Sequence, residues 1–151
     1  MVRWRTPGDG SPPGLSQPSL GDPPGIPSSP SGPPDPYRNL GFRIGRYARR
    51  IFGSELETLS ARVRGRADRE ERALAEGIAI GSGCIPRMEQ NGDDEVCEVR
   101  CIFTAGTKRI TVTPSPLRIP AEALRDAQVY EDFAGWLLAR DDEDLFEVRF
   151  G

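Results

Sequence analysis

EVCEVRCIFTAGTKRITVT, residues 95–113, contains two runs in which apolar and polar side chains alternate. Successive side chains of an extended strand point to opposite faces, so each run predicts a half-buried β-strand. With the tip of a hairpin at Ala105-Gly106, the predicted cross-strand pairs are Phe103 with Lys108, Cys101 with Ile110 and Val99 with Val112. The apolar side chains of both strands then share one face. The opposite face displays Arg100, Thr104, Arg109, Thr111 and Thr113.

The rest of the chain alternates between helical periodicity and short strand patterns. The predicted order is a helix at 37–52, a helix from a capping box at 54–57 to Gly77, a strand at 78–85, a loop at 86–93, the hairpin, a helix beginning at Pro120 and a strand at 145–150. This order implies a two-layer α+β domain, in which helices pack on one face of a mostly antiparallel sheet. The other face of the sheet, the polar one, stays bare.

The first 36 residues differ in composition from the rest. They hold eleven of the fifteen prolines, among Gly and Ser. Such a segment has too little apolar surface to offset its ordering entropy, so we expect a disordered tail at 1–36 and a single domain at 37–151. A plain linker is favoured over a ligand for a polyproline-binding domain. Trp4 lies between Arg3 and Arg5, where its ring could stack on a base or on a partner surface.

The net charge of −3 conceals an uneven distribution along the chain. Residues 37–72 contain ten arginines and five acids, whereas residues 73–151 contain eight basic and fifteen acidic residues. The predicted helix at 37–52 carries no acid and five arginines, namely Arg38, Arg43, Arg46, Arg49 and Arg50. Two interpretations stay open. The basic segment binds a polyanion, or it pairs with the acidic segment within the fold or between subunits.

Residues that carry catalysis are scarce. The chain has no histidine, which excludes Ser-His-Asp and Cys-His catalysis and histidine-ligated zinc. The glycines at 77–83 lack the Lys-Ser/Thr pair of a phosphate loop. Cys97 and Cys101 lie too far apart on one strand for a disulfide, and packing suits them better than metal binding. We therefore expect no enzyme, metal, cofactor or small-molecule substrate.

No apolar run approaches the roughly 18 residues that a membrane-spanning helix needs, and the N-terminus lacks an apolar signal core. We therefore expect a cytoplasmic protein that does not associate with a membrane.

Scattered matches over about residues 40–140 resemble one protein family. They are Arg46-Tyr47 ahead of an Arg-rich stretch, Ser82-Gly83-Cys84 before the sheet, then Phe103, Gly106 and the run at 110–113 before an amphipathic helix. This arrangement is similar to the RNA-silencing suppressors of tombusviruses and their relatives. The resemblance implies a homodimer whose joined sheets grip small interfering RNA duplexes, with tryptophans stacked on the duplex ends, in the cytoplasm of a host cell. Trp4 is the end-stacking candidate, although it lies far from the domain, unlike the family's tryptophans.

The residues that the resemblance carries over form a set of candidate RNA-binding side chains. They are Arg43, Arg46, Arg49 and Arg50 on the basic helix, Arg62 on the next helix, and Arg100, Arg109, Thr111 and Thr113 on the polar sheet face. Arginine suits phosphates and threonine suits the 2′-hydroxyls of A-form RNA. The expected function is sequence-independent binding of short double-stranded RNA, which sequesters small interfering RNA and suppresses host RNA silencing.

The alternative function is that of a viral or cellular protein–protein adaptor or assembly protein, which uses the Pro-rich tail and the sheet surface. Either function is compatible with self-association. An exposed sheet edge at 108–113 or 145–150 predicts a homodimer, because unpaired strand edges tend to pair with a second copy.

Overall fold

The computed structural model describes residues 33–66, 68–90 and 98–151. Its helices are α1 (Pro36–Ile51), α2 (Arg69–Ser82), α3 (Ala127–Ala139) and α4 (Asp142–Leu145), with the short 3-10 helices η3 (Gly53–Thr58) and η4 (Ala121–Leu124). Its strands are β1 (Ser60–Gly65), β2 (Arg87–Gln90), β3 (Arg100–Ala105), β4 (Lys108–Pro114) and β5 (Phe146–Phe150). Trp4 and most of the predicted tail lie outside the described residues, as do residues 95–97 of the predicted hairpin.

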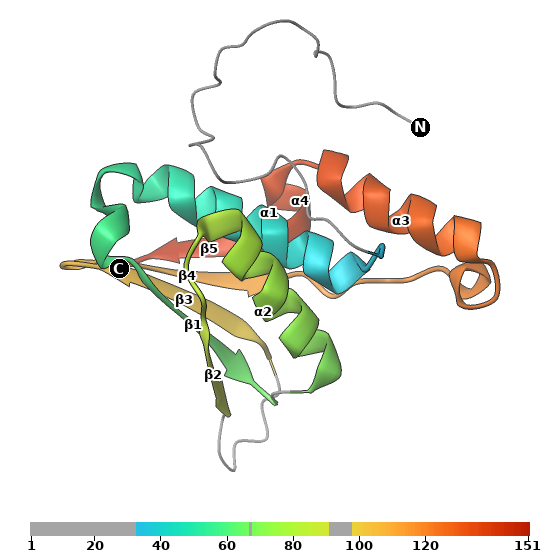
Figure 1. The fold of residues 1–151 in the computed structure, drawn as a ribbon, viewed down its shortest axis with the longest axis horizontal. Helices are drawn as coiled ribbons and strands as arrows, with labels where there is room; N and C mark the ends of the chain where they lie inside the picture. Colours follow the sequence, from blue (N-terminus) through green and yellow to red (C-terminus); the bar gives the residue numbers. More distant parts are fainter. Residues whose placement is uncertain (1–32, 67, 91–97) are drawn as a thin grey trace, which may run out of the picture.

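The strands form one five-stranded sheet in the order β2-β1-β3-β4-β5. β1 and β2 run parallel, and every other neighbouring pair runs antiparallel. The long helices lie together on one side of this sheet (Figure 1). The predicted α+β fold, a mostly antiparallel sheet with a helical layer on one face, is therefore confirmed.

The β3–β4 hairpin keeps the predicted faces but not the predicted register. The observed pairs include Cys101 with Val112, Phe103 with Ile110 and Ala105 with Lys108. Each pair is shifted by two residues from the prediction, because the two-residue loop lies one position later, at Gly106-Thr107 rather than at Ala105-Gly106. Gly106 makes this tight turn with a φ of 63°, which glycine adopts readily. A shift of two residues preserves the alternation of side chains, so the buried face is unchanged.

Residues 60–65 form a strand where the capping box predicts a helix, and that prediction is wrong. β1 is held between β2 and β3. Its side chains alternate, with Ala61 and Val63 buried and Arg62 and Arg64 on the other face. In the part of the predicted helix that precedes this strand, the chain forms only the short 3-10 helix η3. Pairing on both sides outweighs the local helix signal, because strand formation depends on neighbours more than on intrinsic preference.

The strand predicted at 78–85 is also wrong, because helix α2 continues to Ser82. This helix begins after Asp68, whose carboxylate accepts a hydrogen bond of 2.9 Å from the Glu71 amide. It ends at Gly83, which adopts the left-handed conformation with a φ of 76°. The predicted loop at 86–93 contains the edge strand β2. Pro120 caps η4 rather than the long helix, which begins at Ala127.

Glycines allow α1 and α2 to touch along their backbones. Each helix carries two glycines four residues apart, Gly41 and Gly45 on α1 and Gly77 and Gly81 on α2. A methyl group added at Gly77 would lie 1.9 Å from the Arg38 carbonyl oxygen. One added at Gly41 would lie 2.0 Å from the carbonyl oxygen of Leu74. The segment that packs closely against the glycines of α2 is therefore the helix α1.

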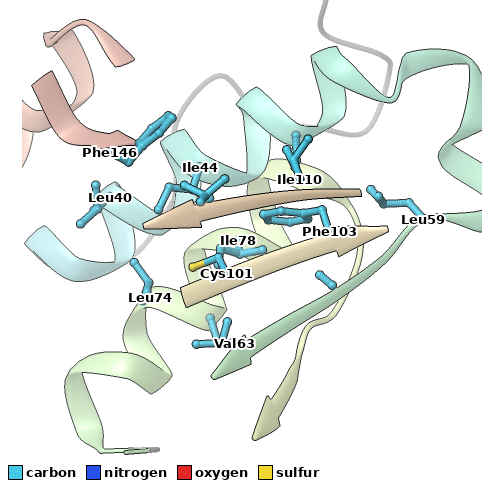
Figure 2. Packing of buried hydrophobic residues seen from close by; sticks show 14 of the residues in the cluster. Leu40, Ile44, Leu59, Val63, Leu74, Ile78, Cys101, Phe103, Ile110 and Phe146 are labelled. Atoms are coloured by element: carbon cyan, nitrogen blue, oxygen red, sulfur yellow. The ribbon is translucent and has the colours of Figure 1, made fainter. Parts of the chain in front are cut away.

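The hydrophobic core lies between the helical layer and the sheet (Figure 2). Buried residues from the four α-helices and from β1, β3, β4 and β5 form it, and Met88 of β2 packs against it. The cluster includes Leu40, Ile44, Leu74, Ile78, Val63, Cys101, Phe103, Ile110 and Phe146. Burial of each large side chain of this kind contributes about 1.5–3 kcal/mol. One face of the sheet is consequently filled by the core, and the opposite face is left for other contacts.

Candidate nucleic-acid interface

The open sheet face is the side of the sheet that faces away from the helices. Directly paired residues point to the same side of a sheet, so the registers identify its members. They are Ser60, Arg62, Arg64, Arg87, Glu89, Arg100, Ile102, Thr104, Arg109, Thr111, Thr113, Glu147 and Arg149. Six of these side chains are arginines and two are glutamates, which leaves a local excess of positive charge.

Acidic side chains neutralise this face only in part. A Glu89 carboxylate oxygen lies 3.3 Å from a guanidinium nitrogen of Arg64 and 3.8 Å from one of Arg62. Arg100 lies 3.5 Å from Glu98, which precedes β3. Exposed pairs of this kind contribute at most about 1 kcal/mol, so phosphates can compete with these glutamates. Within the described ranges, no carboxylate forms a salt bridge with Arg87, Arg109 or Arg149.

Hydroxyl groups lie between the arginines of the open sheet face. The side-chain oxygens of Ser60 and Thr104 are 2.8 Å apart across β1 and β3. Thr111 and Thr113 on β4 are half-buried. The apolar Ile102, which lies opposite Arg62 on β1 and Thr111 on β4, is only 3% exposed. The face therefore presents mainly cations and hydroxyl groups to its surroundings.

The structure separates the candidate residues into two groups. Arg100, Arg109, Thr111 and Thr113 lie on the open sheet face as predicted, and they are joined there by Arg62, which belongs to β1 rather than to a helix. The arginines of α1 lie in the helical layer, on the other side of the sheet (Figure 1). This second group consists of Arg43, Arg46, Arg49 and Arg50.

Arg43 and Arg50 bind the acidic segment inside the fold. The Arg43 guanidinium group donates to the carbonyl oxygens of Leu137 and Leu138, at 3.1 and 3.2 Å, and lies 2.8 Å from the Asp142 carboxylate. The other carboxylate oxygen of Asp142 accepts from Arg50 at 3.0 Å. For these two arginines, the interpretation that the basic segment pairs with the acidic segment within the fold is confirmed.

Arg49 and Arg46 also contact their own chain. Arg49 donates to the carbonyl oxygen of Ser82 at 2.7 Å, where α2 ends and its carbonyl groups lack helical partners. The Arg46 guanidinium carbon lies 5.6 Å from the centre of the Phe42 ring, a cation–π geometry. Arg43, Arg49 and Arg50 of α1 therefore connect this helix to other helices, whereas the Arg46 contact with Phe42 lies within α1.

The sequence interpretation misses three arginines of the open sheet face, namely Arg64, Arg87 and Arg149. Arg64 lies in the segment that the capping box assigns to a helix, and Arg87 lies in the segment assigned to a loop. Arg149 lies in the strand predicted at 145–150, but its neighbours depend on the strand order, which a single sequence does not display. The alternation at 60–65, SARVRG, is the signal that identifies Arg62 and Arg64 as strand residues.

Trp136 is the tryptophan that the structure describes, on helix α3. Its ring is 5.6 Å from that of Phe133 and nearly parallel to it, and the Arg140 guanidinium carbon lies 4.8 Å from its centre. The residue is 49% exposed. It belongs to the helical layer, so it does not contribute to the open sheet face.

A cavity of about 320 Å³ lies beside the first turns of α1 and α2. Its walls include Tyr37, Leu40, Leu74, Val99 and Leu117, and its acidic lining consists of Asp68, Glu70, Glu71 and Glu98. Burial, followed by the Glu70 and Asp68 carboxylates, raises the pKa of Tyr37 above its ordinary value. Four acids repel a polyanion, which makes this cavity unsuited to nucleic acid.

The described cysteines are packing residues. Cys101 is fully buried in the core, and burial, followed by the Glu71 carboxylate, raises the pKa of its thiol to about 12. The Cys84 thiol donates to the Leu59 carbonyl oxygen at 3.4 Å, and burial raises its pKa as well. Cys97 lies outside the described residues. In the part of the chain that the structure describes, no three Cys, Asp or Glu residues are grouped as metal ligands.

No protein-family model matches the sequence, and no curated protein is significantly similar to it. Among the helices of the described residues, none combines the length and the apolar character needed to cross a membrane. The function is therefore inferred from the open sheet face itself.

Proposed function

We propose that this chain binds short double-stranded RNA through its open sheet face, without regard to base sequence. The observation that carries the proposal is the composition of this face, which combines six arginines and four hydroxyl side chains with two glutamates. The role that such binding serves is sequestration of small interfering RNA, and with it suppression of RNA silencing in the cytoplasm of a host cell. Two copies of the chain are expected to act together.

Arginines at regular sheet positions form a grid of phosphate-binding groups. Neighbouring strands are about 4.8 Å apart, and alternate residues of one strand are about 6.7 Å apart. Arg64 on β1, Arg100 on β3 and Arg109 on β4 therefore lie within a few sheet spacings of one another. A guanidinium group binds a phosphate with two parallel hydrogen bonds. Such a grid contacts several phosphates of one duplex at once, which a single basic side chain does not.

The hydroxyl groups favour RNA over DNA. An A-form duplex has a wide, shallow minor groove that displays 2′-hydroxyl groups, and its major groove is too deep and narrow for side chains to read. Thr111 and Thr113 lie beside the arginines, and each hydroxyl both donates and accepts hydrogen bonds. Contacts to phosphates and 2′-hydroxyls carry no base sequence. A preference for RNA duplexes of any sequence follows.

A gel-shift series tests the proposal. Wild-type protein is titrated onto a short RNA duplex, a DNA duplex of the same sequence and the single RNA strand, and the tightest binding is expected for the RNA duplex. The variant R100A/R109A should bind the RNA duplex at least about tenfold more weakly, because each charge-assisted contact contributes roughly 1.5–3 kcal/mol. Both side chains are exposed, so the fold should persist.

The matched control is R72A/R125A, which removes two exposed arginines away from the sheet. It should bind the RNA duplex nearly as tightly as wild type. Equal losses in the two double variants would show that net charge rather than the open sheet face is responsible. A wild-type protein that does not shift the RNA duplex would favour the alternative function, a protein–protein adaptor or assembly protein.

A further inference from the structure

The cavity beside the first turns of α1 and α2 has apolar walls. Leu40 of α1 and Leu74 of α2, which are almost fully buried, form part of them (Figure 2). Val99 and Leu117 are half-buried and pack against the same core. The volume of about 320 Å³ is at the lower end of the range of ligand sites, which is roughly 300–1,000 Å³. The cavity is therefore suited to one large side chain or one small organic molecule.

Four carboxylate side chains line the same cavity. One oxygen of the half-buried Asp68 accepts a hydrogen bond of 2.9 Å from the Glu71 amide. Glu70 and Glu98 are exposed, so they lie at the mouth of the cavity. Among the described residues, no arginine or lysine forms a salt bridge with Asp68 or Glu70. The mouth of the cavity therefore carries negative charge that the described part of the chain does not neutralise.

Helix α2 explains only part of this acidity. Asp68 caps the helix, and Glu70 and Glu71 lie in its first turn, where negative charge interacts favourably with the helix dipole. Glu98 precedes β3 and has no such role. Helix capping also does not account for the apolar walls. A ligand that matches both features is an apolar group with positive charge beside it.

The first 36 residues of the chain contain a group of this kind. Arg3 and Arg5 are the only basic residues among them, and Trp4, which lies between the two, is the only aromatic residue. A large aromatic side chain buries roughly 150–250 Å² of surface, and the indole N–H donates a hydrogen bond that a carboxylate oxygen can accept. The long arginine side chains can bring their guanidinium groups to carboxylates beside the ring. The segment is therefore complementary to the cavity in both charge and apolar character.

The chain connects this segment to the cavity over a sufficient length. The Arg38 guanidinium group donates to the Pro33 carbonyl oxygen, which holds Pro33 beside the first turn of α1. Tyr37, four residues after Pro33, lines the cavity, so the two Cα atoms are at most about 15 Å apart. The 27 residues between Arg5 and Pro33 can span up to about 90 Å. Because a ligand tethered to its site has an effective concentration on the order of millimolar, a contact too weak to hold a free peptide suffices within one chain.

We propose that the segment Arg3-Trp4-Arg5 binds in this cavity of its own chain, with the indole ring against the apolar walls and the two arginines beside Glu70 and Glu98. The contact removes the ring and the apolar walls from water and neutralises carboxylates at the mouth. Trp4 in the cavity is not available to stack on the end of an RNA duplex. Because the cavity does not include residues of the open sheet face, this contact and RNA binding can each hold without the other.

The fluorescence of Trp4 tests the proposal in the 151-residue chain. Trp136→Phe leaves Trp4 as the only tryptophan, because the chain contains two. Compared with a synthetic peptide of residues 1–10, Trp4 in this protein should emit at a shorter wavelength, and acrylamide should quench it severalfold less. Dilution should change neither property, because the segment and the cavity belong to one chain. Emission and quenching equal to those of the free peptide would overturn the proposal.

Charge reversal at the mouth of the cavity tests its role. In the same background, E70K/E98K should raise the quenching of Trp4 to that of the free peptide. Both glutamates are exposed, so the domain should stay folded by circular dichroism. The matched control E131K/E143K makes the same change of charge at exposed positions of α3 and α4 outside the cavity, and Trp4 should stay shielded. Equal release of Trp4 by the two double variants would show an effect of net charge alone and would overturn the cavity as the site.

The reciprocal variant R3E/R5E changes the segment rather than the domain. It should also release Trp4, and its combination with E70K/E98K should restore the shielding, because every pair is then attractive again. A combined variant that leaves Trp4 as accessible as in the free peptide would overturn the pairing between the arginines and the carboxylates. These measurements contain no RNA, so their failure is distinguishable from a failure of the RNA-binding proposal, which the gel-shift series tests.

Discussion

Single residues set the spacing of the helical layer. Gly77 on α2 lies against the Arg38 carbonyl oxygen, and Gly41 on α1 lies against that of Leu74. The clashing atoms belong to the backbone, so a side chain cannot be accommodated by a change of rotamer. Because α1 also carries a large part of the core, a displacement of the two helices affects packing well beyond the glycines.

Gly77→Ala should lower the free energy of unfolding by about 2 kcal/mol or more, because the added methyl group forces the helices apart. Gly135→Ala on α3 is the control, since nothing lies within 4 Å of the added methyl group. There we expect a gain of about 0.5–1 kcal/mol, because alanine is the better helix former. Urea unfolding measures the free energy of unfolding of both variants. Similar effects of the two substitutions would contradict the close contact between α1 and α2.

Cys101 makes the stability of the protein sensitive to alkaline pH. Its pKa is raised from 9.0 to about 12, so the folded state holds the thiol proton more tightly than the unfolded state. This contribution is complete below about pH 9 and is lost as the pH rises toward the folded pKa. The difference in unfolding free energy between wild type and Cys101→Ala should therefore shrink as the pH rises from about 9 to 11. A difference that stays constant over this range would show that the thiol does not titrate differently in the two states.

At the scale of elements, Arg43 connects α1 to the end of α3 and to α4. Its side chain is only 15% exposed and makes three polar contacts. Arg43→Ala should lower the free energy of unfolding by about 1–3 kcal/mol, because two carbonyl groups and the Asp142 carboxylate lose a donor. Arg50→Ala removes a side chain that is 48% exposed and should cost less than about 1 kcal/mol. Thermal unfolding of the two variants measures the contrast, and an Arg43→Ala protein as stable as wild type would refute the structural role.

The elements that are predictable from the sequence are those whose faces are defined by burial. α1 shows clear helical periodicity, and polar and apolar residues alternate along most of β4 and β5 and along β3 except at the buried Ile102. β1 buries only the side chains of Ala61 and Val63 in its interior, a signal weaker than the adjacent capping box. The glycines of α2 lower its helix propensity, yet they permit the contact with α1 that stabilises it. The helix predicted over residues 60–65 and the strand predicted at 78–85 are both wrong because packing between distant segments, rather than local propensity, determines the structure there.

The residues of the candidate site are likewise predictable from the sequence only in part. The alternation of the hairpin places Arg100, Arg109, Thr111 and Thr113 on the polar face, and the structure agrees. Strand order is needed to bring β1, β2 and β5 beside them, and with these strands come Arg62, Arg64, Arg87 and Arg149. The arginines of α1 are conspicuous in the sequence, but a sequence shows charge without showing its partners. Asp142, ninety-nine residues after Arg43, is one of those partners.

At the scale of the whole molecule, the arginines of the two layers differ in their acidic partners. In the helical layer, Arg43 and Arg50 are paired with an acid of their own chain. On the open sheet face, Arg109 and Arg149 have no acidic partner among the described residues. A chain with a net charge of −3 can still attract a polyanion there, because charges more than about 8–10 Å away are largely screened at physiological salt.

The salt dependence of RNA binding tests the central claim most directly. The dissociation constant of a short RNA duplex is measured between about 50 and 300 mM salt for wild type and for folded R100A/R109A, and its logarithm is plotted against that of the salt concentration. Each lost phosphate contact should reduce the slope by about 0.7–0.9, so the variant should be flatter by somewhat under two units as well as weaker. A folded variant with unchanged affinity and unchanged slope would contradict the open sheet face as the surface that binds RNA.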